Sequence, residues 1–198
     1  KGTSKKTSRD IALFFDRIGG YINAFTEREA MCVMCVVPAV MAEQAIDVII
    51  EMIYESALTT DDIDTERNVI ISEIMAVNDD PEENGMEMAL SLMYGHHPVA
   101  RPITGTIADI RAVTPGKLRQ WYKERILTVP PVVTIAGNFE PGLIEKHICG
   151  IQTDTTVPVK TGGPVPEIRP GFQYAVSPFR QSQVFLSWAL NDSRTSRD

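Results

Sequence analysis

Helical and strand-like spacings of apolar residues alternate along the first third of the chain. A helical stripe over residues 9–18 predicts an amphipathic helix, which Thr7 or Ser8 can cap. The apolar residues that share its buried face are Ile11, Phe14, Phe15 and Ile18. Residues 21–26 and 30–37 then read as two strands separated by a short charged turn, which predicts a β-hairpin.

Two long helices are predicted next. Pro38 suits the first turn of a helix over residues 38–56. Its apolar positions are Val40, Met41, Ala45, Val48, Ile49, Met52 and Ile53. Thr59 or Thr60 can cap a second helix over about 60–78, and three aspartates in its first turn suit the positive end of the helix dipole.

The rest of the chain mixes helices with strands. The pattern predicts helices over 83–94, 115–125 and 141–148, a helical turn opening at Thr106, and strands over 132–136, 171–177 and 183–190. This order predicts an α+β fold with helices packed on one face of an antiparallel-rich sheet. We expect a truncated first α+β half over residues 1–152, a Thr-, Pro- and Gly-rich linker over 153–170, and the incomplete start of a second half over 171–198.

Charge and hydropathy narrow the possible functions. A net charge of -7 argues against a nucleic-acid surface, which needs clustered Lys and Arg. No apolar stretch approaches the ~20 residues that span a bilayer, and the densest run, 45–53, is interrupted by Asp47 and Glu51. The sequence opens without Met and without a secretory signal. We therefore expect the true N-terminus upstream and leave the compartment open, with the cytoplasm favoured.

The three cysteines do not indicate a disulfide framework, because their number is small and odd. Cys32 and Cys35 have the spacing of half a zinc site. However, they lie in the strand predicted over 30–37, where residues three apart point to opposite faces. Two buried thiols are therefore the favoured interpretation.

A pair of glutamates is the first candidate for chemistry. Glu66 and Glu73 lie seven residues apart in the helix over 60–78, nearly above one another on one face. Ile70 lies between them, so we expect Glu73 to be drawn towards the core, where a carboxylate needs a cation, a donor or a metal. The alternative is an ordinary solvated helix face.

Histidines are the second candidate. His96 and His97 lie together in a loop before Pro98, with no second group of ligands nearby. They could bind metal, but a turn in which the imidazoles hydrogen-bond to the backbone is favoured. His147 lies late in the helix over 141–148, where a cationic side chain suits the dipole.

Five short segments in a fixed order carry a further signal. They are Lys1-Gly2-Thr3, residues 19–26 (GGYINAFT), residues 66–74 (ERNVIISEI), residues 94–106 (YGHHPVARPITGT) and residues 132–138, which end in Gly-Asn. Each is weak alone. Together they resemble the pitrilysin/insulinase family of zinc peptidases, the inverzincins, and the resemblance extends from Lys1 to about Leu190.

The resemblance implies roles for particular residues. Glu73 would be the third zinc ligand and Glu66 a carboxylate that orients the ligands from outside the coordination sphere. Two neutral histidines and one carboxylate would leave a zinc position open for water, and the glutamate of an H-x-x-E-H motif would act as general base. Asn23, Ala24 and Thr26 would lie on a sheet edge that takes peptide substrate as an added strand.

The H-x-x-E-H motif itself is absent from the sequence. The resemblance implies that its last histidine lies four residues upstream of Lys1. We therefore expect a zinc-dependent metalloendopeptidase acting on peptides or unfolded segments, with zinc in the full-length parent, and neither zinc nor activity in this chain alone. The alternative is a non-catalytic partner or scaffold domain of the same fold.

Expected partners follow from the same reasoning. They are a peptide substrate added to a sheet edge, a second half-domain or homologous subunit, and other copies of this chain through exposed apolar surface. Neither nucleic acid nor a membrane span is expected.

Overall fold

The structure is a computed structural model that describes residues 1–149, 151, 167–176 and 180–188. The chain divides into two compact units. Unit 1 comprises Lys1–Arg67 and Ala112–Thr161, and unit 2 comprises Asn68–Arg111 and Gly162–Asp198.

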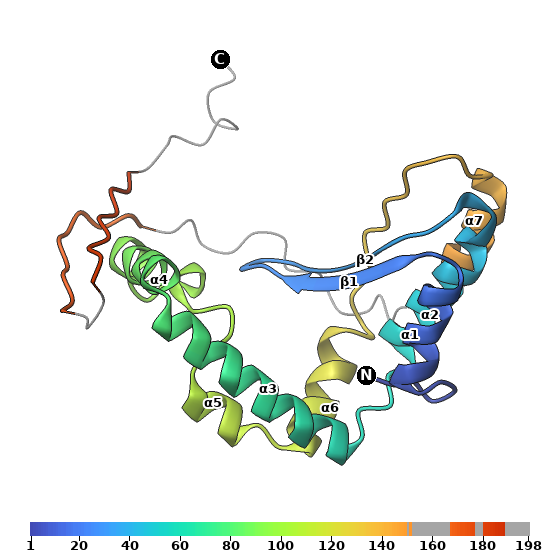
Figure 1. Cartoon of the computed structure of the whole chain (residues 1–198), viewed down its shortest axis with the longest axis horizontal. Helices are drawn as coiled ribbons and strands as arrows, with labels where there is room; N and C mark the ends of the chain where they lie inside the picture. The colour runs from blue at the N-terminus through green and yellow to red at the C-terminus, as the bar shows by residue number, and fades with distance from the viewer. Residues whose placement is uncertain (150, 152–166, 177–179, 189–198) are drawn as a thin grey trace. The chain divides into compact units, whose positions relative to one another are not determined.

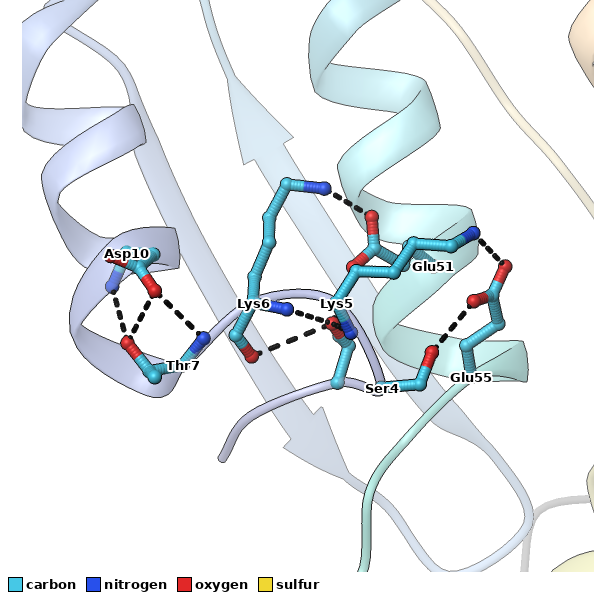
Figure 2. A network of polar contacts seen from close by, with 8 residues as sticks. Ser4, Lys5, Lys6, Thr7, Asp10, Glu51 and Glu55 are labelled. Carbon is cyan, nitrogen blue, oxygen red and sulfur yellow. Dashed lines mark hydrogen bonds and ion pairs between the residues drawn. The ribbon is translucent and has the colours of Figure 1, made fainter.

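Helix α1 (Ser8–Arg17) begins at Thr7, as its sequence predicts. The Thr7 hydroxyl accepts a hydrogen bond from the Asp10 backbone N–H, and the Asp10 carboxylate accepts one from the Thr7 backbone N–H (Figure 2). This reciprocal capping box satisfies two backbone donors that the first helical turn cannot pair. It fixes the point at which the N-terminal segment turns into α1.

The predicted hairpin is confirmed. Strands β1 (Tyr21–Thr26) and β2 (Met31–Val36) pair antiparallel (Figure 1). In their register Tyr21 lies opposite Val36. The turn closes where the Glu27 N–H donates to the Ala30 carbonyl (2.7 Å). In the part of the chain that the structure describes, these two strands make up the whole sheet, so the outer edge of β1 has no paired strand there.

The core of unit 1 lies between two helices and one face of this hairpin. Phe15 of α1 is 2% exposed, and Ala45 of α2 (Ala42–Tyr54) is fully buried. Ile11 and Val48 complete the buried cluster, and Ile22 and Cys35, which are opposite each other in the hairpin, pack against it. The helices therefore lie on one hairpin face, as predicted, and cover the part of it that carries Ile22 and Cys35.

The opposite hairpin face is apolar and exposed. Its large side chains are Tyr21, Phe25, Met34 and Val36, with exposed fractions from 39% to 61%. Alternation along the strands explains this division, because successive side chains point to opposite faces.

Helix α3 (Thr60–Asp79) follows α2 after a short connection and carries the two candidate glutamates. Thr59 caps it by accepting from the Asp62 backbone N–H (3.1 Å).

Leu58 in the connection has a positive φ of 43°, and its carbonyl accepts from Arg119 Nε (3.0 Å). Tyr122 donates its hydroxyl to the Ile53 carbonyl (2.7 Å). Helix α6 (Pro115–Arg125) thus holds the start of α3 in place.

The remaining elements include helices that match the predicted ones closely and a 3-10 helix over residues 98–100, where no helix is predicted. They are η1 (Ala39–Met41) before α2, α4 (Pro81–Tyr94), η2 (Pro98–Ala100), α5 (Ile107–Ala112) and α7 (Pro141–Cys149), which contacts α2 within unit 1. In unit 2, Asp80 caps α4, and the Arg169 N–H donates to the Met93 carbonyl at its end (2.9 Å).

The predictions of three strands are wrong for the residues that the structure describes. Residues 132–136 form no strand, and neither do the described parts of the segments predicted over 171–177 and 183–190. A strand needs a neighbour for its backbone groups, and these segments have none among the described residues. Their apolar side chains are accordingly exposed, as at Val132 (95%), Phe172 (87%) and Leu186 (80%).

The α+β class is confirmed: helices pack on an antiparallel sheet in unit 1. Most of the predicted linker, residues 153–166, lies outside the described residues, so the division into 1–152, 153–170 and 171–198 stays a prediction. Among the helices that the structure describes, none has the length and apolar content to cross a bilayer.

Truncating the buried aromatic ring of the core should unfold unit 1 readily. We expect Phe15→Ala to lower the free energy of unfolding by about 3–5 kcal/mol, because it removes a buried ring and leaves a cavity. Phe25→Ala is the matched control. Since Phe25 is 44% exposed, its loss should cost about 1 kcal/mol. Chemical denaturation followed by circular dichroism measures both, and equal losses would contradict this assignment of the core.

Candidate functional site

Helix α3 carries both candidate carboxylates, as predicted. Glu66 Oε2 lies 2.6 Å from Lys1 Nζ, and both side chains are partly exposed. This ion pair raises the pKa of Lys1, chiefly through the hydrogen bond to Glu66. The first residue of the chain therefore lies beside Glu66.

Glu73 is not drawn towards the core as the sequence predicts. Its side chain is exposed, whereas Ile74, the next residue, is only 6% exposed. Ile63 and Ile74 of α3 are buried and Ile70 is half-buried, so Glu73 lies one position to the side of this apolar stripe rather than on it. Burial therefore does not force a partner on this carboxylate, which agrees with the solvated-face alternative at this position.

The residues predicted to bind substrate lie on β1. Asn23 Oδ1 accepts a hydrogen bond from the neighbouring Ala24 N–H (2.9 Å). Asn23, Ala24 and Thr26 are all exposed. Their position on an edge strand is what the resemblance led us to expect, and their role in binding substrate stays a prediction.

A polar network joins the N-terminal segment to the end of α2, and we call it the N-terminal network (Figure 2). It consists of Thr3, Ser4, Lys5 and Lys6 with Glu51 and Glu55. Glu51 accepts from the Thr3 hydroxyl through one oxygen and from the Lys6 ammonium through the other. Glu55 accepts from the Ser4 hydroxyl (2.9 Å) and the Lys5 ammonium (2.8 Å).

The two glutamates of this network differ in burial. Glu51 and Thr3 are each 8% exposed, whereas the Glu55 side chain is 40% exposed. The hydrogen bond from Lys6, then that from Thr3, lowers the pKa of Glu51. Likewise, hydrogen bonds from Lys5 and Ser4 lower the pKa of Glu55. Both carboxylates are thus stabilised in their charged form.

Sequence reasoning missed this network, although one signal was present. Glu51 follows Val48 by three residues and so lies close to the apolar stripe of α2. A charged residue in that place needs a partner, but its partners Thr3 and Lys6 lie more than 40 residues away in the sequence. The helical pattern could reveal the need for a partner but not its identity.

The histidines and cysteines do not form a metal site among the described residues, where no group of three or more potential ligands lies together. His97 Nδ1 accepts from the Val99 backbone N–H (3.2 Å), which matches the favoured turn interpretation. His147 on α7 lies against Asp47 of α2, with Glu43 3.7 Å away. Cys32 and Cys35 are free thiols, and burial raises the pKa of Cys35.

The residues present fit a zinc site in part. Zinc accepts carboxylate oxygen together with imidazole nitrogen, and a tetrahedral catalytic site needs three protein ligands. Glu73 offers an exposed carboxylate on a regular helix, and Glu66 offers a second one already held by a cation. By the family resemblance, these would be one ligand and one supporting group. Among the described residues, histidines that could complete the set do not lie with them.

Comparison with known proteins shows the family and the fold of this chain. Residues 1–107 match the model of the insulinase family of peptidases, peptidase family M16. The match covers more than half of the 198 residues, and it includes β1, β2 and the whole of α3. The chain therefore belongs to the pitrilysin/insulinase (M16) peptidase family.

Individual relatives are consistent with this membership. The chain is 36% identical over 151 residues to an uncharacterized zinc protease of Mycobacterium leprae, with 74% of this chain and 34% of the relative aligned. The chain spans about a third of the length of the curated relatives that it matches.

Solved structures share the fold. The first half of the periplasmic protease PqqL from Escherichia coli aligns with a TM-score of 0.63 at 16% identity, over 83% of this chain and 37% of that one. An M16 inactive domain from Pseudomonas fluorescens aligns with a TM-score of 0.53 at 20% identity, over 61% and 30%. At these identities the likeness concerns fold alone.

The stabilisation from Glu51 should depend on pH in a defined direction. Its pKa is lower in the folded protein than the ordinary value of about 4.3, so its contribution is present above that value and lost as pH falls through the folded pKa. We expect Glu51→Gln to destabilise the protein at pH 7. The difference from the unmutated protein should shrink by at least about half at pH 3.

Denaturant unfolding at the two pH values measures this effect, with Glu55→Gln as the control. Glu55 has the same direction of pKa shift but a more exposed side chain, so its substitution should have the smaller effect at pH 7. A Glu51→Gln deficit that is equal at both pH values would contradict the assignment.

Proposed function

We propose that this chain is part of a zinc-dependent metalloendopeptidase that hydrolyses peptides or unfolded segments. The observation that carries the proposal is the 2.6 Å contact between Lys1 Nζ and Glu66 Oε2. By family resemblance, the H-x-x-E-H helix ends a few residues before Lys1. A motif upstream would therefore enter the fold beside the helix that carries Glu66 and Glu73.

Each residue of the proposed site has a distinct task. Glu73 would supply the third protein ligand through its exposed carboxylate. Glu66, whose charge is matched by Lys1, would orient a ligand by accepting its N–H. When bound by two imidazoles and a carboxylate, zinc retains an open position and makes a bound water more acidic. The base for that water would come from the upstream motif.

Peptide binding is proposed at the outer edge of β1. That edge has no paired strand among the described residues, and Asn23, Ala24 and Thr26 are exposed along it. An added strand gains affinity from backbone hydrogen bonds, which suits varied sequences. The incoming strand would have to displace Asn23 Oδ1 from the Ala24 N–H.

A second half-domain is the expected partner. The relatives are about three times longer than the aligned part of this chain, and one neighbour is described as the first half of a protease. The exposed apolar side chains at Phe172, Tyr174 and Leu186 are available for such packing. The same surface would promote self-association of this chain alone.

The second candidate function is a non-catalytic partner or scaffold domain. One structural neighbour is described as an inactive M16 domain, so the fold also occurs without activity. The residues immediately upstream of Lys1 discriminate between the two candidates. An H-x-x-E-H motif there supports the peptidase, and its absence supports the scaffold.

Activity and metal content of a longer chain test the proposed ligand roles. With the upstream motif and a complete second half, the protein should hydrolyse peptides and lose this activity on chelation. Glu73→Gln should reduce both zinc content and turnover, because a neutral amide replaces a charged ligand. Glu66→Gln should retain more zinc and lower activity by roughly 10- to 100-fold, as expected for a group that orients a ligand.

The order of these two effects decides the assignment. A solvated-face role predicts that both substitutions are nearly silent. An active longer chain in which Glu73→Gln keeps its zinc and its turnover would show that the third ligand lies elsewhere.

This chain alone should hold no tightly bound zinc, because a carboxylate and one supporting group do not complete a tetrahedral site. Metal analysis after dialysis measures the zinc content, with the longer chain as the positive control. Stoichiometric zinc in this chain would contradict this expectation and would make His96 and His97 the next candidate ligands.

A further inference from the structure

Glu51 is a buried carboxylate with both oxygens engaged. Its side chain is 10% exposed; Oε1 accepts from the Thr3 hydroxyl and Oε2 from the Lys6 ammonium. A carboxylate in such a place is costly unless it is paired and hydrogen-bonded. It therefore constrains the two residues that satisfy it, and both belong to the N-terminal segment (Figure 2).

Thr3 transmits this constraint to the backbone. Its hydroxyl oxygen accepts from the N–H groups of Lys5 (3.1 Å) and Lys6 (2.9 Å). The hydroxyl has one proton to donate; Glu51 is the nearer acceptor, because the Lys6 carbonyl lies at 3.5 Å. The Thr3 N–H closes the same turn by donating to that carbonyl (2.8 Å). Glu51 thus sets the orientation of a hydroxyl that organises residues 3–6.

The same segment is fixed along its backbone. The Ser4 N–H donates to the Glu55 carbonyl (2.9 Å), the Ala57 N–H donates to the Gly2 carbonyl (3.1 Å), and Thr3 forms an antiparallel bridge with Ser56. Lys1 then reaches Glu66 on α3. From Lys1 to Lys6, the segment is held at each step by α2, its connection or α3.

We propose that Glu51 is a positioning residue for the zinc site, acting through Thr3 on the segment that joins the upstream motif to the fold. This inference rests on the proposed function. Metal ligands must be placed within about 0.5 Å of their productive geometry, whereas each residue released from its anchor spans up to about 3.3 Å. Loosening residues 3–6 would therefore move the ligands upstream by more than the site tolerates.

Glu55 serves as the matched control. It is the same residue type one helical turn away, and it also binds the N-terminal segment, through Ser4 and Lys5. However, its side chain is 40% exposed and that of Lys5 is 62% exposed. Exposed ion pairs contribute little, so solvent can replace this contact.

The experiment compares Glu51→Gln with Glu55→Gln in the longer chain that contains the upstream motif. We expect Glu51→Gln to weaken zinc affinity about tenfold, as measured by competition with a chelator, and to lower kcat while KM stays within about twofold. Glu55→Gln should change each quantity by less than about twofold. A purely structural role would not separate kcat from KM, and equal effects of the two substitutions would overturn the inference.

Amide hydrogen exchange supplies a readout that does not depend on zinc. In Glu51→Gln, the amides of Lys5 and Lys6 should exchange faster, because the single carbonyl oxygen of Gln cannot accept from both the Thr3 hydroxyl and the Lys6 ammonium, which weakens the turn around Thr3. In Glu55→Gln they should stay protected. Unchanged exchange in Glu51→Gln overturns the inference.

A second pair of variants covers the case in which Glu51→Gln does not fold. Thr3→Val removes the hydroxyl at nearly the same volume, and Thr3→Ser retains it. Thr3→Val should reproduce the losses in zinc affinity and kcat, and Thr3→Ser should restore them; equal behaviour of the two variants overturns the inference.

If the unmutated longer chain binds no zinc, the proposed function fails as well. Zinc bound equally by the unmutated protein and the Glu51 variant refutes the positioning role alone.

Discussion

A two-stranded hairpin cannot bury its own apolar side chains, and unit 1 is organised by this constraint. Isolated hairpins are marginal in water, so Ile22 and Cys35 need cover from elsewhere. Helices α1 and α2 supply it through Phe15 and Val48. Because α2 is fixed in this way, its C-terminal end becomes a rigid base on which the N-terminal segment and the start of α3 are both built.

The position of the candidate site depends on contacts made by the C-terminal end of α2 and by the start of α3. Glu66 lies on a helix whose start is held by α6, with Arg119 bonded to the connection at Leu58. The N-terminal segment is attached to the end of α2 through Glu51. Two separate sets of contacts thus bring Lys1 and Glu66 together, and neither set includes a predicted zinc ligand. The geometry of the site is a property of the scaffold.

Local patterns in the sequence predict local structure well. The helix over 115–125 and the strand over 21–26 are confirmed with the same bounds, because capping and side-chain periodicity act within a few residues. The strand predicted over 132–136 is wrong, because a strand also needs a neighbour. The expected burial of Glu73 is also wrong. The apolar stripe of α3 is displaced by one residue from the expected position, so Ile74 is buried and Glu73 is exposed.

The N-terminal network also has a consequence for the order of events during synthesis. Thr3 and Glu51 are separated by 48 residues, so Thr3 cannot reach its acceptor during synthesis until α2 has been made. Closing that loop costs conformational entropy, which is recovered only once α2 has packed on the hairpin. The contacts of Thr3 and Lys6 with Glu51 are therefore made late relative to the synthesis of residues 3–6, after α2 has packed in unit 1.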